Sequence, residues 1–175
     1  MKSRCGIALL LIAVAALLIA AIPAVSSAST QLSTYEQQLA KYVNQERAKA
    51  GLEKLHVSAK LVNSARAHST DMGENKYFEH DSTDGTTWAE RIISHGYKRD
   101  GYRVWKAGEN IAWGAGLYSA PVLIVDQWMT SPEHRAVILN KDFKEIGVGA
   151  VSTQGYGSVD GEVWFFTMDA GLRAK

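Results

Sequence analysis

Three short segments carry side chains that could bind a metal. They read YFEH, GENIA and SPEHR, and they contribute His80, Glu109 and His134 in that order. Two imidazoles and one carboxylate suit zinc or another divalent metal, and three protein ligands leave a fourth position for water or a bound molecule. Because these residues are far apart along the chain, a site exists only if the fold brings distant loops together. The sequence therefore predicts a metal-binding cleft that depends on tertiary structure.

Each candidate ligand also has a structural interpretation. His80 precedes a turn at residues 81–85 and could hydrogen-bond that loop, and the Glu109 carboxylate could accept backbone donors at the bend that Gly108 begins. His68 is a rival ligand by residue type, but it lies on the apolar stripe of an expected helix. We therefore expect His68 to be a hydrogen-bonded core residue.

Ser131 belongs to the predicted cleft in a capping role. Ser131 followed by Pro132 is typical of a helix N-cap and first helical position, with the hydroxyl accepting the amide of residue 134. This places His134 in the first turn, where the helix dipole favours the neutral imidazole that can bind a metal. Neighbouring helical side chains point about 100° apart, so Glu133 is expected to face solvent.

The sequence offers no covalent nucleophile. It contains no Gly-x-Ser-x-Gly segment, and its single cysteine, Cys5, lies in the leader. An enzyme would therefore have to activate water. Four tryptophans could line a ligand groove, although tryptophans in a domain of this size are more often packing residues. They are Trp88, Trp105, Trp113 and Trp128.

Helix signals recur in the first part of the chain. Capping boxes at Ser33–Glu36 and Thr87–Glu90 predict two helix starts, and Gly51 and Gly96 predict the ends of those helices. Ser58 is expected to cap a further helix that lies between them.

The second part predicts another helix and a small sheet. A helix is expected to begin at Ser119, with Pro121 in its first turn. Residues 97–118 are rich in glycine and aromatic residues and favour loop and short strand. Segments 145–151 and 162–170 predict two strands joined by a loose polar hairpin. Helices around a small antiparallel sheet indicate an α+β fold.

Residues 1–28 have the features of a secretory signal peptide. Lys2 and Arg4 precede an apolar run, and small residues lead up to Ala28. The alternative is an uncleaved anchor, because the run is near the lower limit for spanning a bilayer. Cleavage after Ala28 would leave residues 29–175 as one secreted, extracellular domain of 147 residues. A domain of that size buries about two thirds of its unfolded surface.

The charge balance bears on which macromolecules the domain could bind, and the cysteine content bears on its stability. Without residues 1–28 the chain has 17 basic and 18 acidic residues, a net charge of −1. This balance gives no overall basic field for nucleic acid or anionic lipid, and no stable membrane insertion is expected after processing. The remaining domain has no cysteine, so its stability depends on packing.

Seven segments in fixed order carry a family resemblance. They read VNQERA, AHSTDM, FEH, GENIA, WMTSPEHR, EIGVG and WFF. In this order they resemble the CAP superfamily, named for cysteine-rich secretory proteins, antigen 5 and pathogenesis-related class 1 proteins. The chain is most similar to the secreted prokaryotic, SCP-like members, and the resemblance covers essentially all of residues 29–175.

The resemblance implies a three-layer α-β-α sandwich with a central antiparallel sheet and a cleft of His and Glu residues. In that pattern the cleft residues match His80, Glu109 and His134. Many eukaryotic members have another Glu three residues after the Trp that matches Trp128, where this chain has Ser131. The four-residue form of the site is therefore incomplete, and the disulfides of eukaryotic relatives are missing too. Their more specific activities do not carry over.

These features favour a secreted binding module over an enzyme, and they assign no catalytic residue. We expect the cleft or an adjacent groove to hold a small apolar, lipid-like or cell-envelope ligand, with zinc or another divalent metal in a structural or tuning role. Two alternatives stay open. One is a zinc-dependent extracellular peptidase or esterase that uses metal-activated water. The other is a surface interaction domain with a relict cleft.

Overall fold

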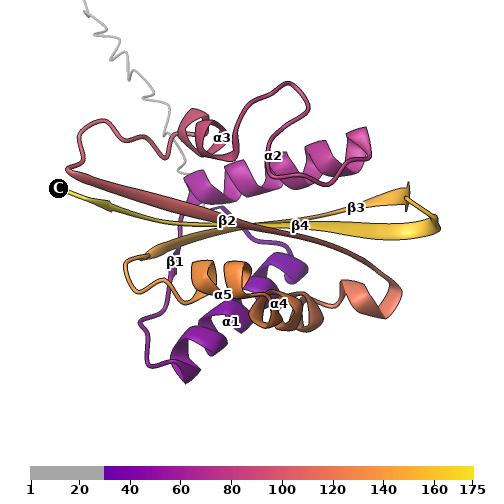
Figure 1. Cartoon of the computed structure of the whole chain (residues 1–175), viewed down its shortest axis with the longest axis horizontal. Coiled ribbons are helices and arrows are strands. Elements are labelled where there is room, and N and C mark those ends of the chain that lie inside the picture. Colours follow the sequence, from indigo (N-terminus) through magenta and orange to yellow (C-terminus); the bar gives the residue numbers. More distant parts are fainter. Residues whose placement is uncertain (1–29) are drawn as a thin grey trace, which may run out of the picture.

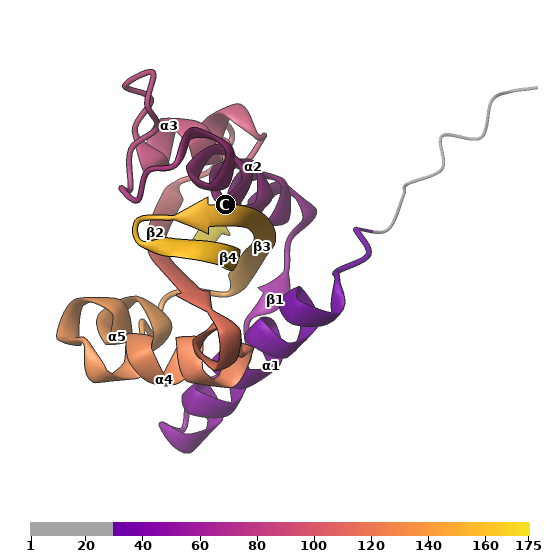
Figure 2. The ribbon, with the colours of Figure 1, turned by 90° about the vertical axis from the view of Figure 1, so that its right-hand side faces the viewer.

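The computed structural model describes residues 30–175, which form three layers (Figure 1). The helices are α1 (Thr34–Lys49), α2 (Ala59–Asn75), α3 (Trp88–Ser94), α4 (Pro121–Thr130) and α5 (Pro132–Ile138), with a 3₁₀ turn, η1 (Gly116–Ser119). The strands are β1 (His56–Val57), β2 (Val104–Ala115), β3 (Glu145–Tyr156) and β4 (Val159–Ala174). Helices α2 and α3 cover one face of the sheet, and α1, α4 and α5 cover the other (Figure 1 and Figure 2). The α-β-α sandwich expected from the resemblance is confirmed.

The predicted signal peptide at residues 1–28 lies outside the described residues. Within residues 30–175, no helix combines the length and apolarity needed to cross a bilayer.

The sheet has the strand order β1-β3-β4-β2. Its three long strands are antiparallel, as expected, and the two-residue β1 adds a parallel pair at one edge. The predicted loose hairpin is wrong. Pairing continues to Tyr156↔Val159, which leaves two residues in the turn, and Gly157 takes the left-handed conformation that a tight turn requires (φ +58°).

Strand β2 is longer than the short strand predicted within residues 97–118. It pairs with β4 over all 12 of its residues, so the partner strand overrides the weak local preference of a glycine-rich segment. Gly114 near its end has a specific purpose. A Cβ there would lie 2.3 Å from the carbonyl oxygen of Tyr118, so the missing side chain lets η1 fold back against the strand.

Both predicted capping boxes are present. The Ser33 hydroxyl accepts the amide of Glu36 at 3.3 Å, and the Glu36 carboxylate accepts the amide of Ser33 at 2.7 Å. Thr87 and Glu90 make the same reciprocal pair at the start of α3. Ser58 occupies the N-cap of α2, but its side chain makes no capping hydrogen bond.

Helix α4 begins later than predicted. Its N-cap is Ala120, and Pro121 is its first residue. Ser119 instead closes η1, because its hydroxyl donates to the carbonyl of Gly116 at 2.7 Å.

The larger apolar core lies between the sheet and the α1, α4 and α5 layer. Its fully buried members include Leu39, Val43, Trp128, Val148 and Phe166. A buried arginine fixes this layer to the segment that follows α5. Arg47 donates to the carbonyls of Glu53, Ile138, Asn140 and Phe143.

On the opposite face of the sheet, the backbone of α2 lies directly against the backbone of β3. A Cβ on Gly147 would lie 2.0 Å from the carbonyl carbon of Leu61, and one on Gly149 would lie 2.5 Å from that of Ala65. Glycine at these two positions therefore lets the helix pack directly on β3.

Candidate functional site

Residues from three distant segments line one cleft across the edge strand β2. His80 comes from the loop after α2, and His134 comes from the first turn of α5. Both line a cavity of about 220 Å³ together with the apolar side chains of Phe78, Ile111 and Trp128. The cleft thus lies between the two helical layers, and the fold brings the two predicted imidazoles to the same hollow.

The buried carboxylate of Glu109 forms a hydrogen bond with the partly exposed imidazole of His80. The carboxylate is 1% exposed, and its Oε1 accepts a hydrogen bond from His80 Nδ1 at 2.8 Å. This hydrogen bond, and then the negative charge of Glu109, raise the pKa of His80 against the opposing effect of burial. The imidazole itself is 47% exposed, so its Nε2 edge is available to a ligand.

A third residue, Arg91, completes this network and was not predicted from the sequence. Its Nη2 donates to Glu109 Oε2 at 2.5 Å and to the carbonyl of His80 at 3.0 Å. The guanidinium is only 5% exposed. Both oxygens of Glu109 are therefore engaged, one with a histidine and one with an arginine.

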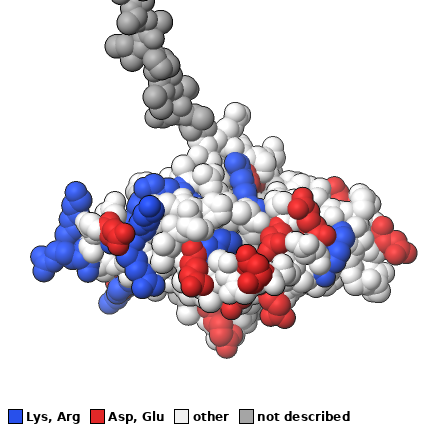
Figure 3. Space-filling view, turned by 90° about the horizontal axis from the view of Figure 1, so that it is seen from above, with Lys and Arg blue, Asp and Glu red and all other residues white. Residues whose placement is uncertain are grey.

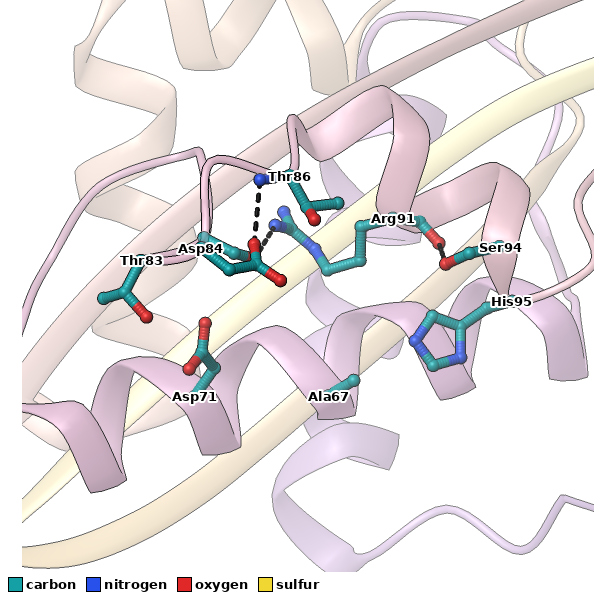
Figure 4. Close-up of a pocket in the computed structure, with 9 residues that line it drawn as sticks. Ala67, Asp71, Thr83, Asp84, Thr86, Arg91, Ser94 and His95 are labelled. Atoms are coloured by element: carbon teal, nitrogen blue, oxygen red, sulfur yellow. Dashed lines mark hydrogen bonds between the residues drawn. The ribbon is translucent and has the colours of Figure 1, made fainter.

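Arg91 also borders a second, polar cavity of about 340 Å³. This cavity lies between α2, the loop after His80 and α3, and its lining includes Asp71, Asp84 and His95 (Figure 4). Arg91 Nη1 donates to the hydroxyl of Ser82 there at 3.1 Å. One buried guanidinium therefore connects the loop of the polar cavity with the carboxylate that holds His80.

Asp169 is a second buried acid beside Glu109. The two residues are directly opposite each other on β4 and β2, and Asp169 is fully buried. Burial, and then the negative charge of Glu109, raise the pKa of Asp169 well above its usual range. Asp169 therefore keeps its proton to a higher pH than an exposed aspartate does. The sequence does carry a signal for this residue, because Asp169 is an acidic residue within an otherwise apolar strand.

His134 is half-buried at the opening of the cleft. Burial, and then the charge of His80, lower the pKa of His134. The direction agrees with the predicted neutral imidazole, but burial is its main cause. Asn110 Nδ2 donates to the carbonyl of His134 at 2.9 Å, which attaches the first turn of α5 to β2.

Ser131 does not cap α5 with its side chain, and that prediction is wrong. Ser131 occupies the N-cap, but its hydroxyl donates to Glu133 Oε2 at 3.1 Å. The hydroxyl is directed at the exposed carboxylate two residues later, and it accepts no backbone amide of the first turn. Glu133 is exposed, as predicted.

His68 is a core residue, as predicted. It is fully buried in α2, and its Nε2 lies 2.9 Å from the carbonyl oxygen of Glu79, to which it donates. This contact ties α2 to the residue before His80.

The predicted set of three metal ligands can be compared with this geometry. Within residues 30–175, no three His, Cys, Asp or Glu side chains are arranged to hold a metal ion. Both oxygens of Glu109 already accept hydrogen bonds, from His80 and Arg91, and its carboxylate is only 1% exposed, which suits an orienting role better than direct ligation. The two imidazoles remain as candidate ligands, with Glu109 as the group that orients His80.

A larger apolar hollow adjoins the cleft. It has a volume of about 550 Å³, and its lining includes Trp113, Tyr118, Leu123 and Gln127. Trp113 and Gln127 also line the His80 cleft, so the two cavities share a wall. The neighbouring Leu117 is 86% exposed and Tyr118 is 78% exposed. Large apolar side chains that are exposed to solvent beside a cavity often mark a binding surface.

Two proteins of Bacillus subtilis (strain 168) are similar in sequence. One is the uncharacterised protein YkwD, 39% identical over 121 residues, a match that covers 69% of this chain and 41% of the relative. The other is the uncharacterised membrane protein YlbC, 36% identical over 107 residues, or 61% of this chain and 28% of the relative. The chain therefore spans less than half the length of these curated relatives.

Two solved structures resemble the fold. An extracellular protein containing an SCP domain from Bacillus anthracis str. Ames superposes with a TM-score of 0.61 at 28% identity, covering 84% of this chain and 45% of that protein. An outer surface protein of Borrelia burgdorferi gives a TM-score of 0.63 at 23% identity, covering 79% and 92%. The second likeness shows the fold alone.

A family model settles the classification. The model of the cysteine-rich secretory protein family, CAP, matches residues 40–169, which include both imidazoles of the cleft and the buried acids beneath it. This chain belongs to the CAP family, as a member of the prokaryotic SCP-like type.

Proposed function

We propose that this domain acts outside the cell as a binding module for an amphipathic molecule, either lipid-like or derived from the cell envelope. The observation that supports the proposal best is the shared wall between a polar cleft and an apolar hollow, formed by Trp113 and Gln127. A polar head group would contact His80 and His134, and an apolar segment would cover Leu123.

The extracellular placement rests on two observations. The leader has the features of a signal peptide, and the Bacillus anthracis protein with a similar fold is described as extracellular.

Apolar contact would supply much of the affinity. Leu117 and Tyr118 are largely exposed, and fully covering one large apolar side chain contributes about 1.5–3 kcal/mol before the entropic costs of binding. The imidazoles would then select the head group, since polar contacts at an apolar site determine orientation more than total affinity.

A divalent metal fits this proposal in a supporting role. We propose that His80 and His134 would hold it, while Glu109 keeps His80 oriented through Nδ1. A bound metal would supply a positive anchor for an anionic head group.

A pair of adjacent substitutions tests the hollow. Leu123 lines it, whereas the neighbouring Val122 does not, and the two side chains are 41% and 39% exposed. Leu123→Glu is expected to weaken binding of a fluorescent fatty-acid probe at least about tenfold, because a carboxylate enters the apolar wall. Val122→Glu is expected to leave binding unchanged. Equal losses, or no binding by the wild type, would contradict the proposal.

Native mass spectrometry of protein recovered from culture medium gives an independent check. We expect a co-purified lipid-like mass that is absent from the Leu123→Glu variant. Preparations that repeatedly carry neither lipid nor metal would count against a binding module.

A further inference from the structure

The balanced net charge of the chain conceals a local excess of cations at one end of the sheet. Lys98, Arg99 and Arg103 are exposed in the segment between α3 and β2, and Lys175 is exposed just after β4. We call these four residues the basic end. Figure 3 shows basic side chains gathered at this end of the molecule, with acidic side chains concentrated elsewhere on the same face. Asp100 is the single acidic residue in that segment.

The strand pairing brings these residues together. Val104 is paired with Ala174, and the amide of Arg103 donates to the carbonyl of Ala174 at 2.9 Å. Arg103 and Lys175 therefore flank the same end of the β2–β4 ladder. Within residues 30–175, none of the four basic-end side chains forms an ion pair with a carboxylate.

Stacking contacts hold the backbone of this surface in place. The Arg99 guanidinium lies 4.5 Å from the ring centroid of Trp105, whose Nε1 donates to the carbonyl of Tyr97 at 2.8 Å. On the other strand, Arg173 lies over the ring of Tyr97 at 4.1 Å and donates to Glu145 at 3.1 Å. A stacked guanidinium still presents the N–H groups on its edge, which suit the oxygens of a phosphate. Of the four basic-end side chains, Arg99 is therefore held in position before any partner arrives, and the Arg173 contacts support the strand beside it.

We propose that the basic end binds a linear polyanion that carries successive phosphate groups. The four cations are exposed and are divided between residues 98–103 and the end of β4, so they suit several phosphates of a polymer better than one phosphate ion. This site is separate from the His80 cleft and does not rest on the function proposed for it.

A phosphate polymer fits this surface better than an anionic membrane. Peripheral membrane surfaces combine cations with apolar side chains that enter the interface. Here the two most exposed large apolar residues, Leu117 (86%) and Tyr118 (78%), follow the opposite end of β2, and Val104 (38%) is the exposed large apolar residue next to Arg103. A strand of 12 residues spans roughly 36 Å, so Leu117 and Tyr118 are well separated from the cations and the basic end itself offers one small aliphatic side chain to an interface.

Salt dependence gives the proposal a quantitative form. For a flexible polyanion, the logarithm of the affinity falls with the logarithm of salt concentration with a slope of about −0.7 per cation engaged. Four cations predict a slope of about −2.8, or a roughly 50-fold loss of affinity between 50 and 200 mM salt. One remaining cation predicts a loss of only about threefold over the same range.

The test uses inorganic polyphosphate as the probe and two triple variants of the secreted protein. Lys98→Gln, Arg103→Gln and Lys175→Gln together remove three cations and keep the Arg99 stack on Trp105. They should flatten the salt slope to about −0.7 and weaken binding strongly at 50 mM salt. The control removes Lys41, Lys49 and Lys54 in the same way, on α1 and the loop after it, and should retain the wild-type slope.

Three outcomes would overturn the proposal. They are no binding of polyphosphate at 50 mM salt, the same slope in both triple variants, or binding to phosphatidylglycerol vesicles without binding to polyphosphate. His134→Ala should bind polyphosphate like the wild type, which keeps this result separate from any failure of the cleft to bind its ligand.

Discussion

At the scale of single residues, the cleft is organised by the partners of two neighbouring acids. Glu109 divides its two oxygens between His80 and Arg91, whereas Asp169, directly opposite it on β4, is buried without an ion pair. Two ionised carboxylates at adjacent cross-strand positions would repel each other strongly in a buried site. Burial and the neighbouring Glu109 raise the pKa of Asp169, so Asp169 keeps its proton to a higher pH than an ordinary aspartate, which relieves that repulsion.

The titration of His80 tests this arrangement. Because the hydrogen bond from His80 to Glu109 raises the pKa of His80, Glu109→Gln is expected to lower it, as followed by NMR of the metal-free protein. Glu133→Gln, an exposed change of the same kind next to His134, should leave the pKa of His80 where it was. An unchanged value in Glu109→Gln would show that another group governs this imidazole.

The raised pKa of Asp169 predicts a pH-dependent stability. Its pKa is raised in the folded state, so its contribution favours folding at acid pH and declines as the pH rises above its unfolded value of about 3.9. Asp169→Asn removes this decline. The free energy of unfolding of the variant, relative to wild type, should therefore increase from about pH 4 to about pH 8 in urea titrations.

Asp84→Asn serves as a control of opposite sign. The backbone amide of Thr86 lowers the pKa of Asp84, so that carboxylate stabilises the fold more as pH rises. The relative stability of Asp84→Asn should therefore fall with rising pH only below the unfolded value of about 3.9, and stay level from about pH 4 to about pH 8. A flat profile for Asp169→Asn would mean that Asp169 is ionised in the folded protein.

At the scale of elements, the contact of α2 with β3 sets the position of the loop that carries His80. Gly147→Ala would place a Cβ 2.0 Å from the backbone of Leu61, so the helix must move away from the sheet. We expect a loss of about 2–3 kcal/mol in the free energy of unfolding. Gly161→Ala, also in the sheet, meets nothing within 4 Å and should be close to neutral. Urea denaturation of both variants would measure the difference, and equal stabilities would refute the close packing.

The elements that could be predicted from the sequence are those with local causes. Both capping boxes form because their donors and acceptors lie within four residues, and the apolar stripe of α2 correctly placed His68 in the core. The full length of β2 could not be predicted, because its pairing with β4 depends on residues about 60 positions later. Arg91 and Arg47 were missed for the same reason, since their partners are assembled only by the fold.

At the scale of the whole molecule, β2 arranges three surfaces in a row. Its first residue adjoins the basic end, its middle carries Glu109 and Ile111 at the cleft, and its last residues border the apolar hollow. If both proposals hold, the basic end would bind the phosphate-bearing part of one molecule while the apolar hollow binds its apolar part, and the protein would not need to change its conformation. This arrangement follows from a single edge strand that pairs on one side only.

Metal binding can be detected through the stability of the whole domain. If zinc binds His80 and His134 only in the folded state, the melting temperature should rise with the concentration of free zinc. At a hundredfold excess of zinc over the dissociation constant, the folded state should gain about 2.7 kcal/mol of stability. The rise should disappear in His134→Ala and fade as pH falls, because protons compete for the imidazoles. Since Glu109 raises the pKa of His80, that competition begins at a higher pH than for an ordinary imidazole. Equal melting temperatures with zinc and with chelator at neutral pH would remove the metal from the proposed site and leave the imidazoles to bind the head group directly.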